Sequence, residues 1–308
     1  MFGLERLRAL HAVAAHGSVA GAAAALHVTP SGVSQQLAKL EKEAGQPLLE
    51  PRGRGVRLTT AGHVLAGHAT RVLEQLARAR AELDLLREDV TGTLRVGAIP
   101  TTLQALLPPA LGALRERHPE LAVVLREGEA EESLPRLVAG ELDVAVLDSW
   151  DHLPVRVPEG VVCVELMADV ADLALPAGHR LAHRRVVDLG EVDDIGWIGW
   201  SVGSGCHGWL EHVLRGEGLG GRITCAVGGY PTQLALVAGT VGAAVVPRLG
   251  RVVVPEGVRM IATRPVLGRR ILAVTRAEDV ERGVVRACVD VLREVADRFT
   301  QGEVGVGR

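Results

Sequence analysis

Residues 17–37 read GSVAGAAAALHVTPSGVSQQL, and this pattern predicts two helices joined by a tight turn. Ser18 is a good N-cap for a helix over Val19–Leu26, because its hydroxyl can accept hydrogen bonds from the N–H groups of the first turn. A break of three residues, 27–29, follows, and its last residue, Thr29, caps the next helix. Pro30 then occupies the first helical position, where a missing N–H costs nothing.

Apolar residues at helical spacing extend the pattern on both sides. A helix before it, ending near Gly17, is predicted by Leu4, Leu7, Leu10 and Val13. The helix that starts at Pro30 ends at Gly45 and has one apolar face, made of Val33, Leu37 and Leu40. Its opposite face offers Ser31, Ser34, Gln35, Ala38 and Lys39. This arrangement is typical of a helix-turn-helix, whose second helix can read base edges in the major groove.

A segment of alternating glycine and arginine follows, reading PRGRGVRL over residues 51–58. Between apolar anchors, such a segment predicts a hairpin wing whose arginines face phosphates or a minor groove. The alternative is a solubilising surface loop. The position of residues 51–58 directly after the helix-turn-helix favours the wing over the surface loop.

Thr59 caps a long helix that we expect to run to about Arg87. Its apolar residues follow an unbroken heptad spacing: Leu65, Ala69, Val72, Leu76, Ala79, Leu83 and Leu86. A helix of about 28 residues spans ~42 Å, which is long for a helix packed only on its own domain. We therefore interpret it as a dimerising linker helix, with packing on its own domain as the alternative.

From Thr91 onward, strand and helix patterns alternate. Strands are expected over 93–99, 122–126, 143–147, 172–175, 196–198, 223–227, 243–246 and 271–274, and helices over 103–117, 133–139, 208–215, 232–238 and 280–299. Such alternation favours an α/β fold with parallel sheets covered by helices.

Charge and composition limit the possible partners. Residues 1–60 carry seven Lys and Arg against four Glu, whereas the whole chain has a net charge of −3. A basic head on an acidic remainder indicates a nucleic-acid module joined to something else. Aromatic residues make up 2% of the chain, and Phe2 is the only one before Trp150, which argues against a single-strand stacking platform in the head. We expect no membrane span, because the apolar runs fall far short of ~20 residues.

The four cysteines, at 163, 206, 225 and 288, show neither a metal spacing nor a disulfide framework. Polar residues such as Glu5, His11 and Ser18 interrupt the apolar start of the chain, so we do not expect secretion. A reducing cytoplasm fits both observations.

The segments 17–37, Leu40-Glu41, Leu48-Leu49 and LTTAG at residues 58–62 together resemble the LysR-type transcriptional regulators. TLRVG at 93–97 and LVAG at 236–239 resemble the same family's effector domain. The resemblance implies a winged helix-turn-helix over 1–60, a dimerising linker helix over 61–90 and a periplasmic-binding-protein-like effector domain over 91–300. It further implies two α/β lobes, about 91–165 with 264–300 and about 166–263, and a ligand cleft between them.

Site residues follow by position from this resemblance. The DNA-binding set is Ser18, Thr29, Pro30, Ser31, Ser34, Gln35, Lys39, Arg52, Arg54 and Arg57. The effector-binding set is Pro100, Thr101, Thr102, Ser201, Gly203, Ser204 and Cys206. Two departures, Leu49 where the family usually has Phe and Pro51 where it has Arg, affect the packing of the wing and one phosphate contact.

Two segments in the effector region match sequence motifs that are found in enzymes. Residues 199–203 fit the nucleophile elbow G-x-S-x-G, but the histidines after Ser201 are both in the adjoining helix, and a hydrolase needs one far downstream. Residues 203–208 fit the dinucleotide motif G-x-G-x-x-G, but between Glu217 and Glu256 no acidic residue is present to bind a ribose. What remains is a helix N-terminus with Ser201 and Ser204, which suits an anionic or polar effector.

Cys206 raises the alternative of a redox sensor, because a helix N-terminus stabilises a thiolate. Peroxide-sensing members of the family use a cysteine pair in this region. This chain has Arg215 and Glu217 where a resolving cysteine would be expected, and Cys225 falls in a predicted strand.

The leading hypothesis is a DNA-binding regulator, not an enzyme, that acts as a dimer or tetramer and responds to a small-molecule effector. Its expected partners are double-stranded DNA, a second copy of the chain and the effector, with no cofactor and no metal. An enzyme or a solute-binding protein built on the two-lobed body are the other candidates. Neither of them needs a helix-turn-helix with an arginine-rich wing.

Overall fold

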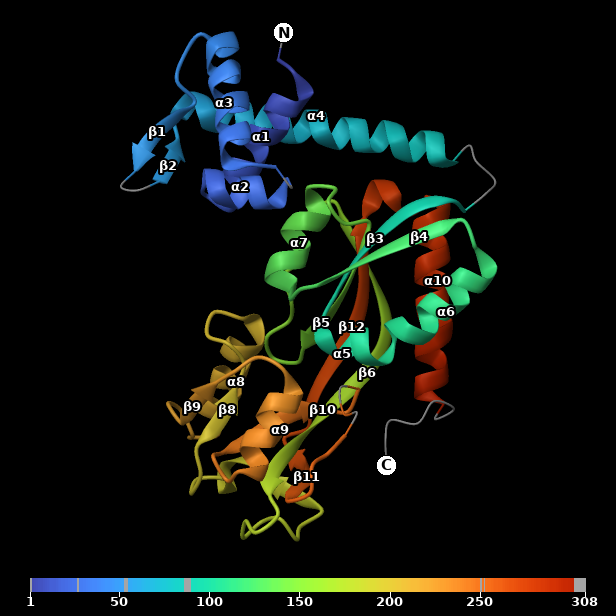
Figure 1. Cartoon of the computed structure of the whole chain (residues 1–308). Helices are drawn as coiled ribbons and strands as arrows, with labels where there is room; N and C mark the ends of the chain where they lie inside the picture. The colour runs from blue at the N-terminus through green and yellow to red at the C-terminus, as the bar shows by residue number, and fades with distance from the viewer. Residues whose placement is uncertain are drawn as a thin grey trace. The chain divides into compact units, whose positions relative to one another are not determined.

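The computed structural model describes residues 2–26, 28–52, 55–85, 90–249, 251 and 253–301 (Figure 1). The chain divides into two compact units, Met1–Leu83 and Asp84–Arg308, which we call the head unit and the body unit.

The three helices predicted at the start of the chain are confirmed in the head unit: α1 (Leu4–His16), α2 (Val19–Ala25) and α3 (Pro30–Ala44). The hydroxyl of Ser18 accepts from the N–H of Gly21 at 3.0 Å, and that of Thr29 accepts from the N–H of Gly32 at 3.1 Å. Both caps are therefore as expected. Gly17 and Gly45 end α1 and α3 with φ of 67° and 69°, a left-handed conformation that glycine adopts without strain.

The wing is a two-stranded antiparallel hairpin of β1 (Leu49–Arg52) and β2 (Gly55–Leu58), in which Leu49 lies opposite Leu58. The carboxylate of Glu41 in α3 accepts from the N–H groups of Leu48 and Leu49 at 2.8 and 3.1 Å. The start of the wing is thus fixed to the helix before it.

The long helix α4 covers Thr60–Leu85 and begins, as predicted, after a Thr59 cap that accepts from the N–H of Gly62. Gly62 lies so close to the carbonyl of Leu48 that a Cβ would have no room. The solvent exposure of the heptad positions changes along the helix. Ala69 is fully buried in the core of the head unit, whereas Val72 and Leu76 are 43% and 47% exposed.

Lobe 1 of the body unit contains three parallel strands in the order β4-β3-β5: β3 (Gly92–Ala98), β4 (Leu121–Glu127) and β5 (Val144–Trp150). Four helices complete it, namely α5 (Pro100–Ala105), α6 (Leu107–Arg117), α7 (Ala130–Val138) and α10 (Gly283–Thr300). In Figure 1, α6 and α10 lie on one face of the strands and α7 on the other. The single helix expected over 103–117 is in fact two, because Pro108 and Pro109 lack the N–H groups needed to continue α5.

Lobe 2 contains β8 (Trp197–Gly199), parallel to both β9 (Ile223–Ala226) and β10 (Ala243–Pro247), with helices α8 (Gly205–Gly216) and α9 (Tyr230–Ala238). A short parallel pair, β7 (Val186–Asp188) and β11 (Val258–Arg264), extends it. Two 3₁₀ turns complete the body unit, Leu189–Glu191 in lobe 2 and Ala277–Asp279 after the last strand.

Two long antiparallel strands, β6 (Val161–Pro176) and β12 (Leu267–Arg276), join the lobes. Leu166 and Ile271 belong to the core of lobe 1, whereas Leu173 and Leu267 belong to the core of lobe 2. The parallel strands expected from the sequence are present in each lobe, but the sheet that joins the lobes is mixed, because β6 and β12 pair antiparallel with their neighbours.

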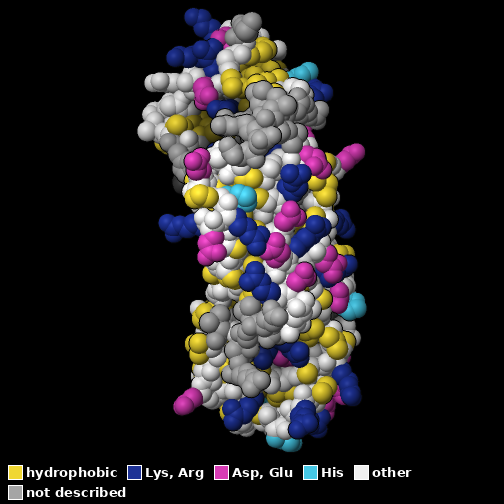
Figure 2. Space-filling view, turned by 90° about the vertical axis from the view of Figure 1, so that its right-hand side faces the viewer, with side chains coloured by type: hydrophobic (Ala, Val, Ile, Leu, Met, Phe, Trp, Pro, Cys, Tyr) yellow, Lys and Arg dark blue, Asp and Glu magenta, His cyan; other side chains and the backbone are white. Residues whose placement is uncertain are grey.

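Figure 2 shows one face of the molecule, on which acidic and basic side chains are interspersed over the body unit. An ion pair between Arg117 of α6 and Glu294 of α10, at 2.6 Å, belongs to this kind of mixed surface. No helix among the described residues combines the length and the apolar character needed to cross a bilayer.

Candidate functional site

The outer face of α3 is the first candidate site. Ser31, Ser34, Gln35 and Lys39 are all exposed there. The Ser34 hydroxyl donates to the carbonyl of Pro30 at 2.9 Å, and the Ser31 hydroxyl is 3.0 Å from that of Thr29. Gln35 and Lys39 have no hydrogen-bond partner among the described residues. A long amide and an ammonium group on a capped, rigid helix are thus available to an external partner.

The other residues expected to touch DNA lie around this helix. Pro30 and Thr29 are exposed at its start, while the Ser18 hydroxyl serves as the cap of α2. In the wing, Arg57 makes an ion pair with Glu50, which lies opposite it in the hairpin. Arg54 and the side chain of Arg52 lie outside the described part of the chain.

The second candidate site is a cavity of about 690 Å³ in the body unit. It is lined by residues 129–131, 134, 135 and 138 around α7, by 148 and 150 of β5, by 153–156 and 158 of the segment after β5, and by 205, 206 and 209 of α8. Both lobes therefore contribute to its walls. A volume of this size suits an organic molecule, because small-molecule sites usually measure ~300–1,000 Å³.

An aromatic cluster forms one wall of this cavity. The rings of Trp150 and Trp209 have centroids 3.9 Å apart, and Trp200 lies edge-on to both. Tyr230, the only tyrosine of the chain, is edge-on to Trp200 at 5.9 Å. Three of the four tryptophans and the single tyrosine of this chain thus lie at one place.

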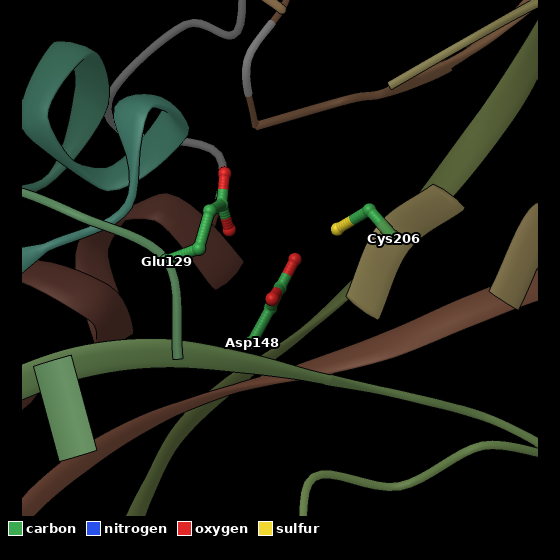
Figure 3. A group of neighbouring side chains, drawn as sticks. All are labelled: Glu129, Asp148 and Cys206. Atoms are coloured by element: carbon green, nitrogen blue, oxygen red, sulfur yellow. The ribbon is translucent and has the colours of Figure 1, made fainter. Parts of the chain in front are cut away.

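Three polar side chains converge at the cavity from separate elements (Figure 3). Glu129 comes from the turn between β4 and α7, Asp148 from β5 and Cys206 from the first turn of α8. Their ligand atoms all lie within 4.8 Å of one another, which is close enough for one cationic group to contact all three. Glu129 and Asp148 lie at the carboxyl ends of parallel strands, where open α/β sheets usually bind ligands.

Arg269 of β12 pairs with Asp148, does not itself line the cavity and is 2% exposed. Its guanidinium donates to Asp148 at 2.7 Å, to Asp169 at 2.8 and 2.9 Å, and to the Thr101 hydroxyl at 3.2 Å. It also lies over the Trp150 ring, 5.3 Å from its centroid. The residue joins the strands of lobe 1 to β6 at the junction of the lobes.

Burial changes the protonation of the groups at the cavity. It raises the pKa of Glu129 to about 7, and the neighbouring carboxylates of Asp148 and Glu131 act in the same direction. Burial, with Asp148 and Glu129, also raises the pKa of the Cys206 thiol well above its usual value. The thiolate that a helix N-terminus was expected to stabilise is therefore disfavoured, and all four cysteines are free thiols.

Of the residues expected to bind an effector, Cys206 lines the cavity. The hydroxyl of Thr102 is buried, donates to the carbonyl of Ile99 at 2.9 Å and does not line this cavity, while its neighbour Thr101 accepts from Arg269. Ser204 caps α8 by accepting from the N–H of His207. The other expected residues, Pro100, Ser201 and Gly203, are likewise not part of the cavity lining.

The principal residues of the cavity were not found by sequence reasoning. One signal was present: Asp148 and Arg269 are charged residues inside or at the end of apolar strand patterns. A buried strand tolerates a charge when an opposite charge faces it. Their pairing, across 121 positions of sequence, was not visible in the spacing.

The chain is similar to known proteins over nearly its whole length. A family model described as bacterial regulatory helix-turn-helix protein, lysR family, matches residues 4–63, and one described as LysR substrate binding domain matches residues 87–297. A probable hydrogen peroxide-inducible genes activator of Streptomyces viridosporus is 30% identical over 296 residues, covering 94% of this chain and 93% of that protein. The transcriptional activator IlvY of Salmonella typhimurium is 30% identical over 242 residues, covering 77% and 79%.

Solved structures show the same fold. A full-length OxyR from Pseudomonas aeruginosa has a TM-score of 0.64 at 23% identity and covers 96% of this chain and 98% of its own. Full-length CbnR in complex with its target DNA has a TM-score of 0.58 at 24% identity, with coverages of 95% and 99%.

Proposed function

Because the chain belongs to the family of LysR-type transcriptional regulators, we propose that it binds specific duplex DNA through α3 and the wing and responds to a small molecule in the body-unit cavity. The observation that carries the DNA-binding part is the outer face of α3. Gln35 and Lys39 are exposed there on a helix that the Thr29 cap and the buried Leu37 hold rigid.

Each group on this face has a distinct use on DNA. A glutamine amide can donate to and accept from the major-groove edge of adenine, so Gln35 supplies sequence preference. Lys39 supplies a phosphate contact, which carries no sequence information but fixes the position of the helix. Ser31, Ser34 and the arginines of the wing complete the proposed surface.

The exposed part of α4 supports a homodimer or a higher oligomer. Val72 and Leu76 continue the heptad spacing beyond the head-unit core, where they are left open to solvent. A second copy packed along this seam would present two recognition helices to two half-sites. A DNA-binding protein of this kind works in the cytoplasm, where the chromosome is.

The cavity supports control by an effector, because its walls come from both lobes. A ligand that contacts both would favour one arrangement of the lobes over another about β6 and β12. The similarity to a peroxide-inducible activator supports redox control less well. Cys206 is a buried thiol whose pKa is raised, and Arg215 occupies the place expected for a resolving cysteine.

Selection of duplexes from a random pool by the full chain tests this function. We expect enrichment of one motif with two related half-sites separated by about one helical turn, 10–10.5 base pairs, or a multiple of it. A pool that stays random after repeated rounds would contradict the proposal.

A further inference from the structure

We propose that the body-unit cavity takes an organic cation, an ammonium or amidinium group on an apolar body, held between Glu129 and Asp148. This inference rests on the proposed function of the cavity as the effector site and names the class of ligand. It differs from the anionic or polar effector expected from the sequence, because the hydroxyls of Thr102, Ser201 and Ser204 are not in the cavity wall.

The charges around the cavity are the first argument. Glu129, Glu131 and Asp148 line it, against a single cation, the exposed Arg156. The buried Arg269 forms ion pairs with both Asp148 and Asp169. One positive charge thus faces two negative charges, so these three buried groups together carry a net negative charge. A carboxylate ligand would be repelled by this arrangement, whereas a cation is attracted by it.

The apolar walls are the second argument. Trp150 and Trp209 form a stacked surface, and Leu134, Val138 and Leu153 add aliphatic side chains. Aromatic faces attract cations as well as apolar groups. The combination of an aromatic wall and carboxylates at one end therefore matches a ligand with an apolar body and a positive head.

The indole N–H of Trp150 lacks a strong acceptor. Trp150 is 4% exposed and lines the cavity, and its indole N–H has no hydrogen-bond partner of ordinary geometry among the described residues. The interaction that it does make is with the Cys206 sulfur, which is a weak acceptor. A buried donor of this kind is normally satisfied in a complete site. We infer that the ligand places an acceptor atom next to its cationic group.

A metal ion fits the same three side chains less well. Asp148 already accepts from Arg269 at 2.7 Å, and a buried thiol with a raised pKa must first lose its proton to bind a metal. A metal site also needs no cavity of 690 Å³ with aromatic walls.

Three matched probes test the class of ligand on the full chain: 4-phenylbutylamine, 4-phenylbutanol and 4-phenylbutyrate share one body and differ in the charge of the head. Tryptophan fluorescence reports binding, because three of the four tryptophans lie at or next to the cavity. We expect the amine to bind at least about ten-fold more tightly than the butyrate, with the alcohol between them. Glu129→Gln should weaken the amine about ten-fold and leave the alcohol unchanged. Glu116→Gln, an equal change of charge on the exposed surface of α6, should alter neither.

The alternative outcomes have separate meanings. Tighter binding of the butyrate would overturn the cation and leave the cavity as the effector site. Binding of Zn²⁺ that is lost in both Glu129→Gln and Cys206→Ser, with no discrimination among the three probes, would assign a metal and overturn the organic cation. If none of the probes binds, both the cation and the cavity as its site are overturned, whereas DNA binding by the head unit is tested independently by duplex selection.

Discussion

Arg269 holds the junction between the lobes through charge. It is fully enclosed and contacts two aspartates, Asp148 of lobe 1 and Asp169 of β6. Its Nε and Nη2 groups both donate to one oxygen of Asp169, Oδ2, so two of its donors are satisfied there. A buried ion pair of this kind adds little stability against an apolar core, but loss of one partner leaves the other charge uncompensated.

We therefore expect Arg269→Met to destabilise the body unit by about 3–5 kcal/mol. The neighbouring Arg270→Met serves as the control, because Arg270 is about half exposed and its ion pair with Glu165 is long, at 3.9 Å. That change should cost less than about 1 kcal/mol. Urea unfolding followed by tryptophan fluorescence measures both, since all tryptophans lie in the body unit. Equal effects of the two substitutions would show that Arg269 does not hold the junction.

Glu129 makes the stability of the body unit depend on pH. Its pKa is about 7 in the folded state, above its ordinary value of 4.5, so the folded state binds this proton more tightly than the unfolded state does. Stability therefore falls as the pH rises from about 4.5 to about 7. The groups that act on Glu129 are Asp148, Glu131 and Glu132, which raise its pKa, and Arg269, which lowers it.

Glu129→Gln should raise stability at pH 8 by an amount on the order of 1–2 kcal/mol, less than the full linkage value because the side chain is only partly buried. The gain at pH 5 should be smaller, because Glu129 is already protonated in the folded protein at that pH. Thermal unfolding at both pH values measures the difference. The same gain at pH 5 and pH 8 would argue against a raised pKa.

At the scale of elements, two glycines of α4 offer a matched test of how the wing meets this helix. A Cβ at Gly62 would overlap the carbonyl of Leu48, whereas nothing lies within 4 Å of a Cβ at Gly67. Gly62→Ala should destabilise the head unit by about 1–3 kcal/mol. Gly67→Ala should stabilise it by about 0.5–1 kcal/mol, because alanine is the better helix former. Hydrogen exchange of the amides of α3 and α4 in the full chain measures both, and protection that is unchanged by Gly62→Ala would contradict the close approach.

The exposed heptad positions of α4 carry the prediction about assembly. Val72→Asp combined with Leu76→Asp should give monomers, because two charges would be buried in the seam between helices. Gly67→Asp adds the same group to another face of α4, with open space around it, and should leave the oligomer intact. Sedimentation at matched concentrations distinguishes the forms. If the Val72/Leu76 variant sediments like the parent chain, the dimer does not use this seam.

Elements whose signals are local could be predicted from the sequence. The caps Ser18, Thr29 and Thr59 each act within three residues, so their helices begin where expected. Strand β6 shows the limit. Only residues 172–175 were expected, whereas the strand begins at Val161, and its first part alternates irregularly between exposed, half-buried and buried positions. Its direction, antiparallel to β12, is set by the tertiary fold and leaves no mark in the local pattern.

At the scale of the whole molecule, the exposed face of α3 was predictable and the cavity was not. Gln35 and Lys39 belong to one short helix whose exposed face follows from its apolar spacing. The cavity combines Glu129 before α7, Asp148 and Trp150 of β5 and Cys206 of α8, which come from three separate places in the chain. No spacing rule brings them together, because their proximity depends on how two lobes meet across β6 and β12.

Sequence-specific DNA binding by α3 is the property on which the proposed function depends. A titration of the full chain with a selected duplex and with a scrambled duplex of equal length, at several salt concentrations, tests it most directly. We predict that the parent chain prefers the selected duplex by about 10³-fold or more, and that Gln35→Ala loses about 1–3 kcal/mol on that duplex alone. Lys39→Ala should weaken both duplexes equally and reduce the salt dependence by about one phosphate contact. Equal affinity of the parent chain for the two duplexes, or a Gln35→Ala protein that binds both as the parent does, would contradict the claim.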